Sequence, residues 1–330
     1  MQLWQVLILG ALQGVSELFP ISSLGHAVLL PALLSWTITE GTIAGVKCTT
    51  ATPCNFVNYE GQDKYLALLV AFHLATAIAL LFFFWRDWLN VVRSLLGSLQ
   101  RRALVYDRGS KFAWLLVAGT IPVGIIGLLA EKRVRDLFTN PSIVAVFLVI
   151  NGFIMLLGEF LRRRSVGQQF ADEPEAVAVG GGGDTYVRRS QTPQSSSRPG
   201  LATEDLSFGQ GAAVGVAQAL ALLPGISRSG VSMVSGLFFG LTHAEAARFS
   251  FMLATPVILL AAIYKVPSLF SSENRDILGM AVAGAVLSGI CAYLSVRFLM
   301  RYFQSKRLDP FGYYSLIVGI VALVVLFVRG

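Results

Sequence analysis

Six apolar runs, each about as long as a bilayer-spanning helix, constrain this chain more than any other feature of its sequence. Only 14% of the residues are charged, whereas a soluble domain carries roughly a quarter. The net charge of +7 is therefore interpreted as basic loops at a membrane surface, and not as a nucleic-acid-binding face. The sequence predicts an all-α integral membrane protein with spans at residues 65–85, 112–130, 142–161, 249–264, 277–296 and 311–328.

Two polar islands interrupt the apolar sequence. The first island is residues 13–26 (QGVSELFPISSLGH), and the second island is residues 224–232 (PGISRSGVS). Glu17 and His26 are the only ionisable side chains of residues 1–34, and Arg228 is the only charged residue between 206 and 242. Because charges within a membrane are costly and usually functional, we expect the fold to bring the two islands together.

Each island also contains a helix break. Pro20 interrupts the helical pattern of residues 1–34, and Pro224 with Gly225 interrupts residues 206–242. The positive-inside rule places loops 86–111, 162–205 and 297–310 in the cytoplasm, and loops 35–64, 131–141 and 265–276 outside. Segment 206–242 must then return to the side on which it starts. Both broken segments are therefore predicted to be re-entrant, entered from opposite faces.

The order of one broken segment followed by three spans occurs twice, in residues 1–161 and 206–330. Short matches accompany it, such as FHLAT at 72–76 and FMLAT at 251–255. The sequence thus predicts an inverted-topology repeat with its working site at the breaks. Between the halves, residues 162–205 have the Gly/Ser/Pro-rich composition of a disordered cytoplasmic linker.

The residue types of the islands suit phosphate chemistry. Gln13 and Glu17 are four residues apart and share one helix face. Serines after each break can cap the next half-helix, and two helix N-termini with Arg228 form an anion cradle. Glu17 could bind a divalent cation or transfer a proton. His26 is the candidate base and Ser23 the candidate nucleophile.

Structural roles stay open for several side chains. His73, alone on its apolar span, is interpreted as structural, and Cys291 as a packing residue. Cys48 and Cys54 share one polar loop and could form a disulfide or remain two free thiols. Purely structural roles as buried polar groups or helix caps are also open for Glu17, His26, Ser22, Ser227 and Ser229.

Together the islands resemble the motifs of the BacA/UppP family of undecaprenyl-diphosphate phosphatases. The pattern (E/Q)GxxEFxPxSSxGH is present at 13–26, and PGxSRSxxT at 224–232, with Ser232 at the threonine position. FWRD at 84–87 and TIP at 120–122 extend the resemblance over most of the chain. Gln13 stands where glutamate is commoner, which leaves one acidic ligand. Leu24 stands where threonine is frequent, which favours Ser23 as the nucleophile.

The resemblance implies hydrolysis of undecaprenyl diphosphate to undecaprenyl phosphate and inorganic phosphate. This reaction recycles the lipid carrier of peptidoglycan synthesis and confers bacitracin resistance. It also implies a multi-pass protein of the bacterial inner membrane with its site facing the periplasm, and a divalent cation, Mg²⁺ or Ca²⁺, as cofactor. The partners implied are the polyprenyl diphosphate and membrane lipids but no nucleic acid, and a homodimer stays open.

The resemblance assigns roles residue by residue. His26 would activate Ser23, or a water molecule in its place. The implied sets are catalysis by Glu17, Ser23, His26 and Arg228, substrate binding by Gln13, Ser22, Gly25, Ser227, Ser229 and Ser232, and metal binding by Glu17 and Gln13.

Two other functions compete with a phosphatase of this family. A transporter or lipid flippase would explain inverted repeats with broken helices, but it has no need of a Ser–His–Glu–Arg set. A type 2 phosphatidic-acid phosphatase pairs its Ser-Arg motif with a downstream His and Asp, whereas here His243 is the first histidine after Arg228 and no aspartate follows at the required distance. A purely structural membrane protein would not need two polar islands.

Overall fold

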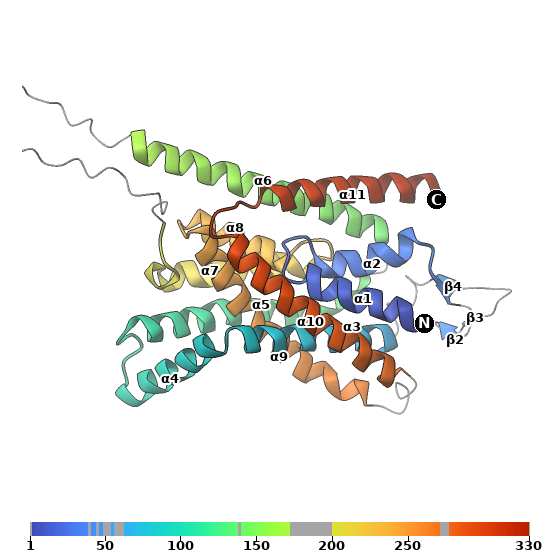
Figure 1. The fold of residues 1–330 in the computed structure, drawn as a ribbon, viewed down its shortest axis with the longest axis horizontal. Coiled ribbons are helices and arrows are strands. Elements are labelled where there is room, and N and C mark those ends of the chain that lie inside the picture. The colour runs from blue at the N-terminus through green and yellow to red at the C-terminus, as the bar shows by residue number, and fades with distance from the viewer. Residues whose placement is uncertain are drawn as a thin grey trace, which may run out of the picture.

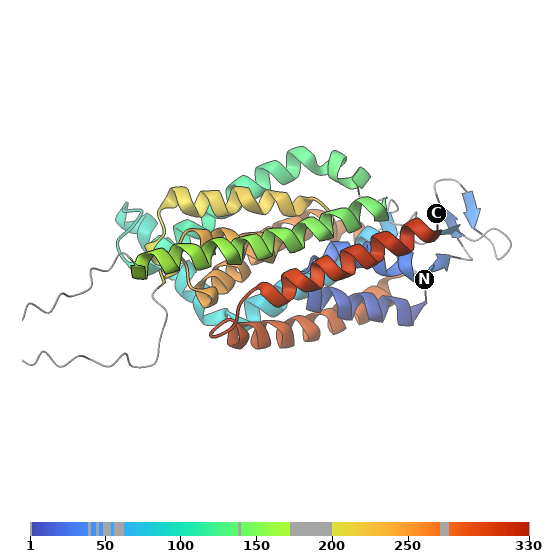
Figure 2. The same cartoon turned by 90° about the horizontal axis from the view of Figure 1, so that it is seen from above.

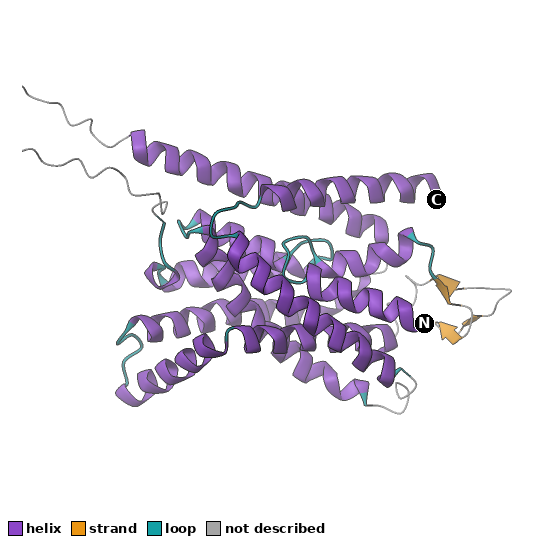
Figure 3. Cartoon of the chain, in the orientation of Figure 1, coloured by secondary structure: helices purple, strands orange, loops and turns teal. Residues whose placement is uncertain are grey.

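The structure, a computed structural model, describes residues 2–38, 41–43, 46–48, 54–55, 63–137, 140–171, 200–270 and 277–329. Helices make up nearly all of the described chain, and two small pairs of short strands lie at one end (Figure 3). The helices are α1 (Leu3–Ser16), α2 (Ser23–Leu33), α3 (Asp63–Phe83), α4 (Trp85–Arg101), α5 (Arg108–Leu137), α6 (Pro141–Ala171), α7 (Phe208–Gln218), α8 (Arg228–Phe238), α9 (His243–Leu269), α10 (Leu278–Tyr302) and α11 (Asp309–Arg329), with 3₁₀ turns at Thr203–Asp205 and Ala219–Leu222.

Five of the described helices, α5, α6, α9, α10 and α11, are long and apolar enough to cross a membrane. A sixth candidate is the bent pair formed by Ala67–Phe83 of α3 and by α4. The prediction of a multi-pass helical membrane protein is therefore confirmed. Several helices exceed the predicted spans, because α5, α6 and α9 continue into segments expected to be loops.

The segment after α3 corrects the sequence-based interpretation. Residues 86–111 were expected to form a loop because they carry six basic side chains. The structure instead places α4 there, and the chain bends by 81° between α3 and α4. Charge content alone misled this prediction, since apolar side chains also recur along α4 with helical spacing.

Each island lies where the chain is interrupted. Residues 17–22 separate α1 from α2, and residues 223–227 follow the 3₁₀ turn after α7 and precede α8. The two ends of each broken segment lie together. The rings of Trp4 and Trp36 are 5.2 Å apart, and the Leu201 N–H donates to the Gly240 carbonyl oxygen at 2.9 Å.

The long helices hold the broken segments in place. α6 packs along α11, α3 along α10 and α9, and α5 along α7 (Figures 1 and 2). α1 approaches α10 closely, because a Cβ atom on Gly10 would lie 3.0 Å from the Gly284 Cα. Small residues at such contacts allow helix backbones to come together in membranes.

The strands β1 (Thr37–Ile38), β2 (Gly41–Ile43), β3 (Val46–Cys48) and β4 (Cys54–Asn55) lie in the predicted polar loop 35–64. β1 pairs with β4 and β2 with β3, both antiparallel. The side chains of Cys48 and Cys54 lie outside the described part of the structure, as do residues 172–199 of the predicted linker. The alternatives for the two cysteines and the prediction of disorder for residues 172–199 therefore stay predictions. The ends of the predicted linker are instead ordered, because residues 162–171 continue α6 and Thr203–Asp205 form a 3₁₀ turn.

Candidate active site

The two islands lie against each other. The Ser229 hydroxyl donates to the Phe19 carbonyl oxygen at 3.3 Å. A Cβ atom on Gly25 would lie 3.1 Å from the Gly225 Cα, so a side chain there would require one backbone to move by a few tenths of an ångström. Gly225 itself has φ of +109°, a conformation that favours glycine. The prediction that the fold joins the islands is confirmed.

Glu17 is the centre of the joined islands and is 8% exposed. Arg228 donates from Nη2 to Oε1 of Glu17, and Ser23 donates its hydroxyl hydrogen to Oε2. Gln13 donates from Nε2 to the same Oε2 at 2.8 Å. The second amino group of Arg228 donates to the Ala254 carbonyl oxygen at 3.2 Å. A carboxylate this buried needs a charge partner, and Arg228 supplies it.

The serines after each break cap the half-helices. Ser22 Oγ accepts from the Gly25 N–H at 3.2 Å, and Ser227 Oγ accepts from the Gly230 N–H at 3.2 Å. The capping interpretation is confirmed for these two residues. Ser232 donates to the Arg228 carbonyl oxygen of its own helix at 2.8 Å. Their predicted contacts with substrate stay predictions.

His26 is paired differently from the expectation that it activates Ser23. Its Nδ1 lies 2.7 Å from the Ser22 carbonyl oxygen, and its Nε2 lies 2.9 Å from the Tyr314 hydroxyl of α11. Both ring nitrogens therefore have partners, while Ser23 turns across the break toward Glu17. Ser22 has φ of +69°, which is strained for serine. The hydrogen bond from His26 helps to hold this peptide.

His73 is a site residue that the sequence interpretation missed. Its Nε2 lies 3.3 Å from Oε2 of Glu17, and its Nδ1 lies 2.7 Å from the Leu69 carbonyl oxygen. His73 therefore contacts the central carboxylate, a position that the sequence interpretation did not give it. The available signal was an ionisable side chain isolated on an apolar span.

Asn151 of α6 is the second missed residue, and it bridges the two islands. Its Nδ2 donates to the Pro20 carbonyl oxygen at 3.2 Å, and its Oδ1 accepts from the Ser227 N–H at 2.9 Å. Nδ2 also lies 3.2 Å from the Ser315 hydroxyl. The side chain is fully buried. One amide thus fixes the position of each break relative to the other.

This geometry suits the binding of an anion. The N-termini of α2 and α8 meet at the joined islands, and both carry partial positive charge. Arg228 adds a full charge, and its side chain is 15% exposed, so it is accessible in part. The Ser23 hydroxyl already donates to a carboxylate that could accept its proton. A candidate nucleophile, a candidate base and a candidate anion cradle are therefore assembled in one place.

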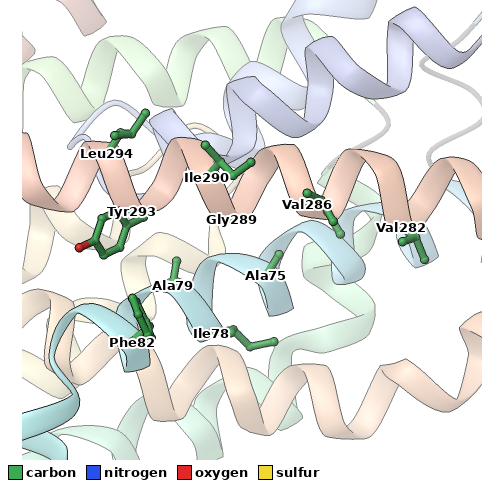
Figure 4. Close-up of a pocket in the computed structure, with 11 residues that line it drawn as sticks. Ala75, Ile78, Ala79, Phe82, Val282, Val286, Gly289, Ile290, Tyr293 and Leu294 are labelled. Atoms are coloured by element: carbon green, nitrogen blue, oxygen red, sulfur yellow. The ribbon is translucent and has the colours of Figure 1, made fainter.

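A separate groove of about 570 Å³ lies between α3 and α10 (Figure 4). Its walls are apolar, with Tyr293 as the one lining residue that carries a polar side chain. None of the site residues lines it. Figure 4 shows small side chains at its floor, such as Ala75 and Ala79. It is a feature of the apolar outer surface and not part of the polar site.

Comparison with known proteins gives the family. Residues 6–321 match the family model described as "Bacitracin resistance protein BacA". The chain belongs to the BacA family. The match runs through both islands and all of the long helices, so the site described above is the site of a BacA-family chain.

Curated BacA relatives resemble the chain over almost its whole length. "Undecaprenyl-diphosphatase" of Mycolicibacterium paratuberculosis is 44% identical, covering 98% of this chain and 97% of that protein. "Undecaprenyl-diphosphatase 2" of Frankia alni is 42% identical, covering 96% of each chain. The protein of the same name from Chromobacterium violaceum is 36% identical, covering 97% of each.

The donor set of this BacA-family site suits a metal that is shared with substrate. The described residues contain no group of three or more His, Cys, Asp or Glu side chains that could enclose an ion. Glu17 offers a carboxylate, and Gln13 Oε1 is buried with no hydrogen-bond partner in the described part of the chain. Mg²⁺ is commonly bound by one or two protein oxygens together with substrate phosphates. The two residues fit that mode.

For Asn151 we expect that substitution by leucine lowers kcat by about tenfold or more, since small displacements of reacting groups are costly. Leucine has a similar size but leaves the Ser227 N–H and the Pro20 carbonyl oxygen without their partner. Ser315→Ala is the matched control, because it removes only the third contact. Equal kcat values for the two purified variants would contradict the bridging role.

Proposed function

We propose that the protein removes the terminal phosphate from undecaprenyl diphosphate, giving undecaprenyl phosphate and inorganic phosphate. The observation that carries this proposal is the contact of Glu17 with both Ser23 and Arg228 where two helix N-termini meet. The names of the BacA relatives support the same substrate. The family description further supports bacitracin resistance when the protein is abundant.

In the proposed reaction, the terminal phosphate lies between the N-termini of α2 and α8, beside Arg228. The Ser23 oxygen attacks its phosphorus while Glu17 accepts the serine proton. The anhydride P–O bond breaks, and the lipid phosphate leaves with the proton from Glu17. Water then attacks the phosphoserine, giving one proton to Glu17, which returns it to the departing Ser23 oxygen as inorganic phosphate leaves.

The other polar groups position these reactants. Arg228 and the helix N-termini stabilise the negative charge that develops on the transferred phosphoryl group. His73 contacts Glu17 and restricts its orientation. His26 holds the Ser22 peptide through its carbonyl oxygen. The alternative in which His26 is the base requires its ring to leave Tyr314. Comparison of the activities of the single variants His26→Ala and Tyr314→Phe tests that alternative.

A divalent cation, Mg²⁺ or Ca²⁺, is proposed to bind to Glu17 and Gln13 together with the diphosphate. When bound, it would neutralise phosphate charge. We expect Gln13→Glu to lower the Mg²⁺ concentration for half-maximal activity by about tenfold, because a carboxylate replaces an amide ligand. Titration of Mg²⁺ into chelator-treated enzyme checks this, with Gln5→Glu on the same helix as the matched control. An unchanged Mg²⁺ requirement would argue against Gln13 as a ligand.

The proposed topology is an inverted repeat in the bacterial inner membrane, with both broken segments re-entrant and the site open to the periplasmic side. The hydrogen bonds between Leu201 and Gly240 support the return of the second segment to its starting side. The contact of Trp4 with Trp36 supports the same for the first. Single cysteines are placed at the outer ends of α1 and α2 and in the loop between α10 and α11. Labelling of these cysteines from each side of sealed vesicles tests this arrangement.

The decisive experiment is phosphate release from undecaprenyl diphosphate by the purified full chain. Release by the wild type, and none by the variant Glu17→Gln/Arg228→Gln purified alongside it, is the expected result. No release by the wild type under any divalent cation would overturn the phosphatase. The rival function, a transporter or flippase, would instead move labelled lipid across liposomes in the catalytically inactive variant.

A further inference from the structure

α4 combines three distinct side-chain strips on one helix. One strip, which includes Val91 and Ser98, is buried against α5, and Trp114 Nε1 donates to the Ser98 hydroxyl at 2.9 Å. A second strip is apolar and exposed to between 43% and 59%. It consists of Trp85, Leu89, Val92, Leu96 and Leu99, which recur at helical spacing.

The third strip is basic and adjoins the apolar one. Arg86, Arg93 and Arg101 are exposed. Within the part of the chain that the structure describes, none of the three pairs with a carboxylate. The one acidic residue of α4, Asp87, accepts from Arg248 Nη2 of α9 at 2.6 Å. Arg86 Cζ lies 5.2 Å from the centroid of the Trp85 ring, and Arg101 Cζ lies 4.8 Å from that of the Tyr106 ring. A ring contact uses the face of a guanidinium group, so the N–H donors at its edge can still bind an anion.

The bend before α4 suits a position at a membrane surface. α3 is apolar over Ala67–Phe83, and α4 departs from it by 81°. With α3 along the bilayer normal, this bend would place α4 close to the membrane plane. α4 lies at the opposite end of the molecule from the two termini (Figure 1). A helix of this kind buries its apolar strip at the headgroup–acyl boundary, with its basic strip among the headgroups.

We propose that α4 is a binding site for anionic phospholipid, with the apolar strip against acyl chains and Arg86, Arg93 and Arg101 against headgroup phosphates. Guanidinium groups bind phosphate oxygens in a bidentate manner, and a zwitterionic headgroup offers no net negative charge to attract them. Basic residues near any span end would be expected from topology alone. The adjoining exposed apolar strip and the bend distinguish α4 from such residues.

α4 and the active site both contact α9. Arg248, held by Asp87 of α4, lies on α9 six residues before Ala254, whose carbonyl oxygen accepts from Arg228. α4 and the catalytic arginine are thus joined through one helix. The proposed lipid site does not depend on the proposed reaction, since it requires only a membrane with anionic lipid.

The test is lipid binding by the purified full chain, titrated with phosphatidylglycerol or phosphatidylcholine of matched acyl chains and measured by native mass spectrometry. We expect tighter binding of phosphatidylglycerol by the wild type. The triple variant Arg86→Gln/Arg93→Gln/Arg101→Gln should bind it about a hundredfold more weakly, at about fivefold per arginine. Leu89→Gln/Leu96→Gln, with every charge kept, should also weaken binding.

The matched control is Arg297→Gln/Arg301→Gln/Lys306→Gln, which removes the same charge from exposed positions near the end of α10. It should change binding less than the α4 variant does. Equal weakening by both triple variants would show an effect of net charge only and would overturn the site. Equally tight binding of phosphatidylcholine and phosphatidylglycerol by the wild type would also overturn it. Unchanged thermal unfolding of the α4 variant establishes that it is folded.

Discussion

Arg228→Lys is expected to lower phosphate release by about a hundred- to a thousandfold, the loss seen when one preorganised donor to a developing charge is removed. Lysine keeps the positive charge, but it cannot donate from two amino groups in a fixed plane. Arg228 uses that plane to contact Glu17 Oε1 and the Ala254 carbonyl oxygen together. The measurement is kcat/KM for undecaprenyl diphosphate with purified wild type and variant.

A pair of further variants separates catalysis from folding. Arg228→Gln alone removes the guanidinium charge that pairs with the buried Glu17 carboxylate, which costs about 3–5 kcal/mol of stability. The double variant Glu17→Gln/Arg228→Gln removes both charges and should regain most of the unfolding temperature while staying inactive. Activity of Arg228→Lys within threefold of the wild type would show that charge alone is needed and that the fork geometry is not.

The sequence predicted best the positions of charged side chains that lie within apolar segments. Glu17 and Arg228 are charges within apolar segments, so a site containing both follows from the cost of burying them separately. The serines and Pro20 lie beside those charges and were found with them. The spans followed from apolar run length. The helical spacing of apolar side chains within α4 also indicates a helix, but the arginines of this segment favoured its interpretation as a basic loop.

The residues that the sequence did not predict act across long sequence distances. Asn151 joins Pro20 to Ser227, and nothing local to α6 indicates which backbone groups its amide will reach. His73 contacts Glu17 only because α3 packs beside α1. Likewise, the partner of His26 Nε2 is the hydroxyl of Tyr314, which is 288 residues away. Sequence spacing identifies candidate groups, whereas tertiary packing decides which of them form hydrogen bonds.

Ser23→Ala is expected to lower kcat by about 10⁴-fold or more, because removing a nucleophile leaves only binding and electrostatic stabilisation. Ser16→Ala is the matched control. The Ser16 hydroxyl donates to the Leu12 carbonyl oxygen of its own helix at 2.6 Å, and Ser16 has no predicted role in the site, so this variant should keep most of the activity.

A second measurement distinguishes attack by Ser23 from attack by water. Brief reaction with substrate labelled in its terminal phosphate, followed by acid quenching, should leave label on wild-type protein and none on Ser23→Ala. If water attacks directly, Glu17 remains the base and Ser23 only orients the Glu17 carboxylate, since the Ser23 hydroxyl donates to its Oε2. Ser23→Ala would then retain measurable turnover, and neither protein would carry label. The Ser23–Glu17 contact predicts that the wild type is labelled and that Ser23→Ala is inactive. In this contact the hydroxyl hydrogen already points to the carboxylate oxygen that would accept it.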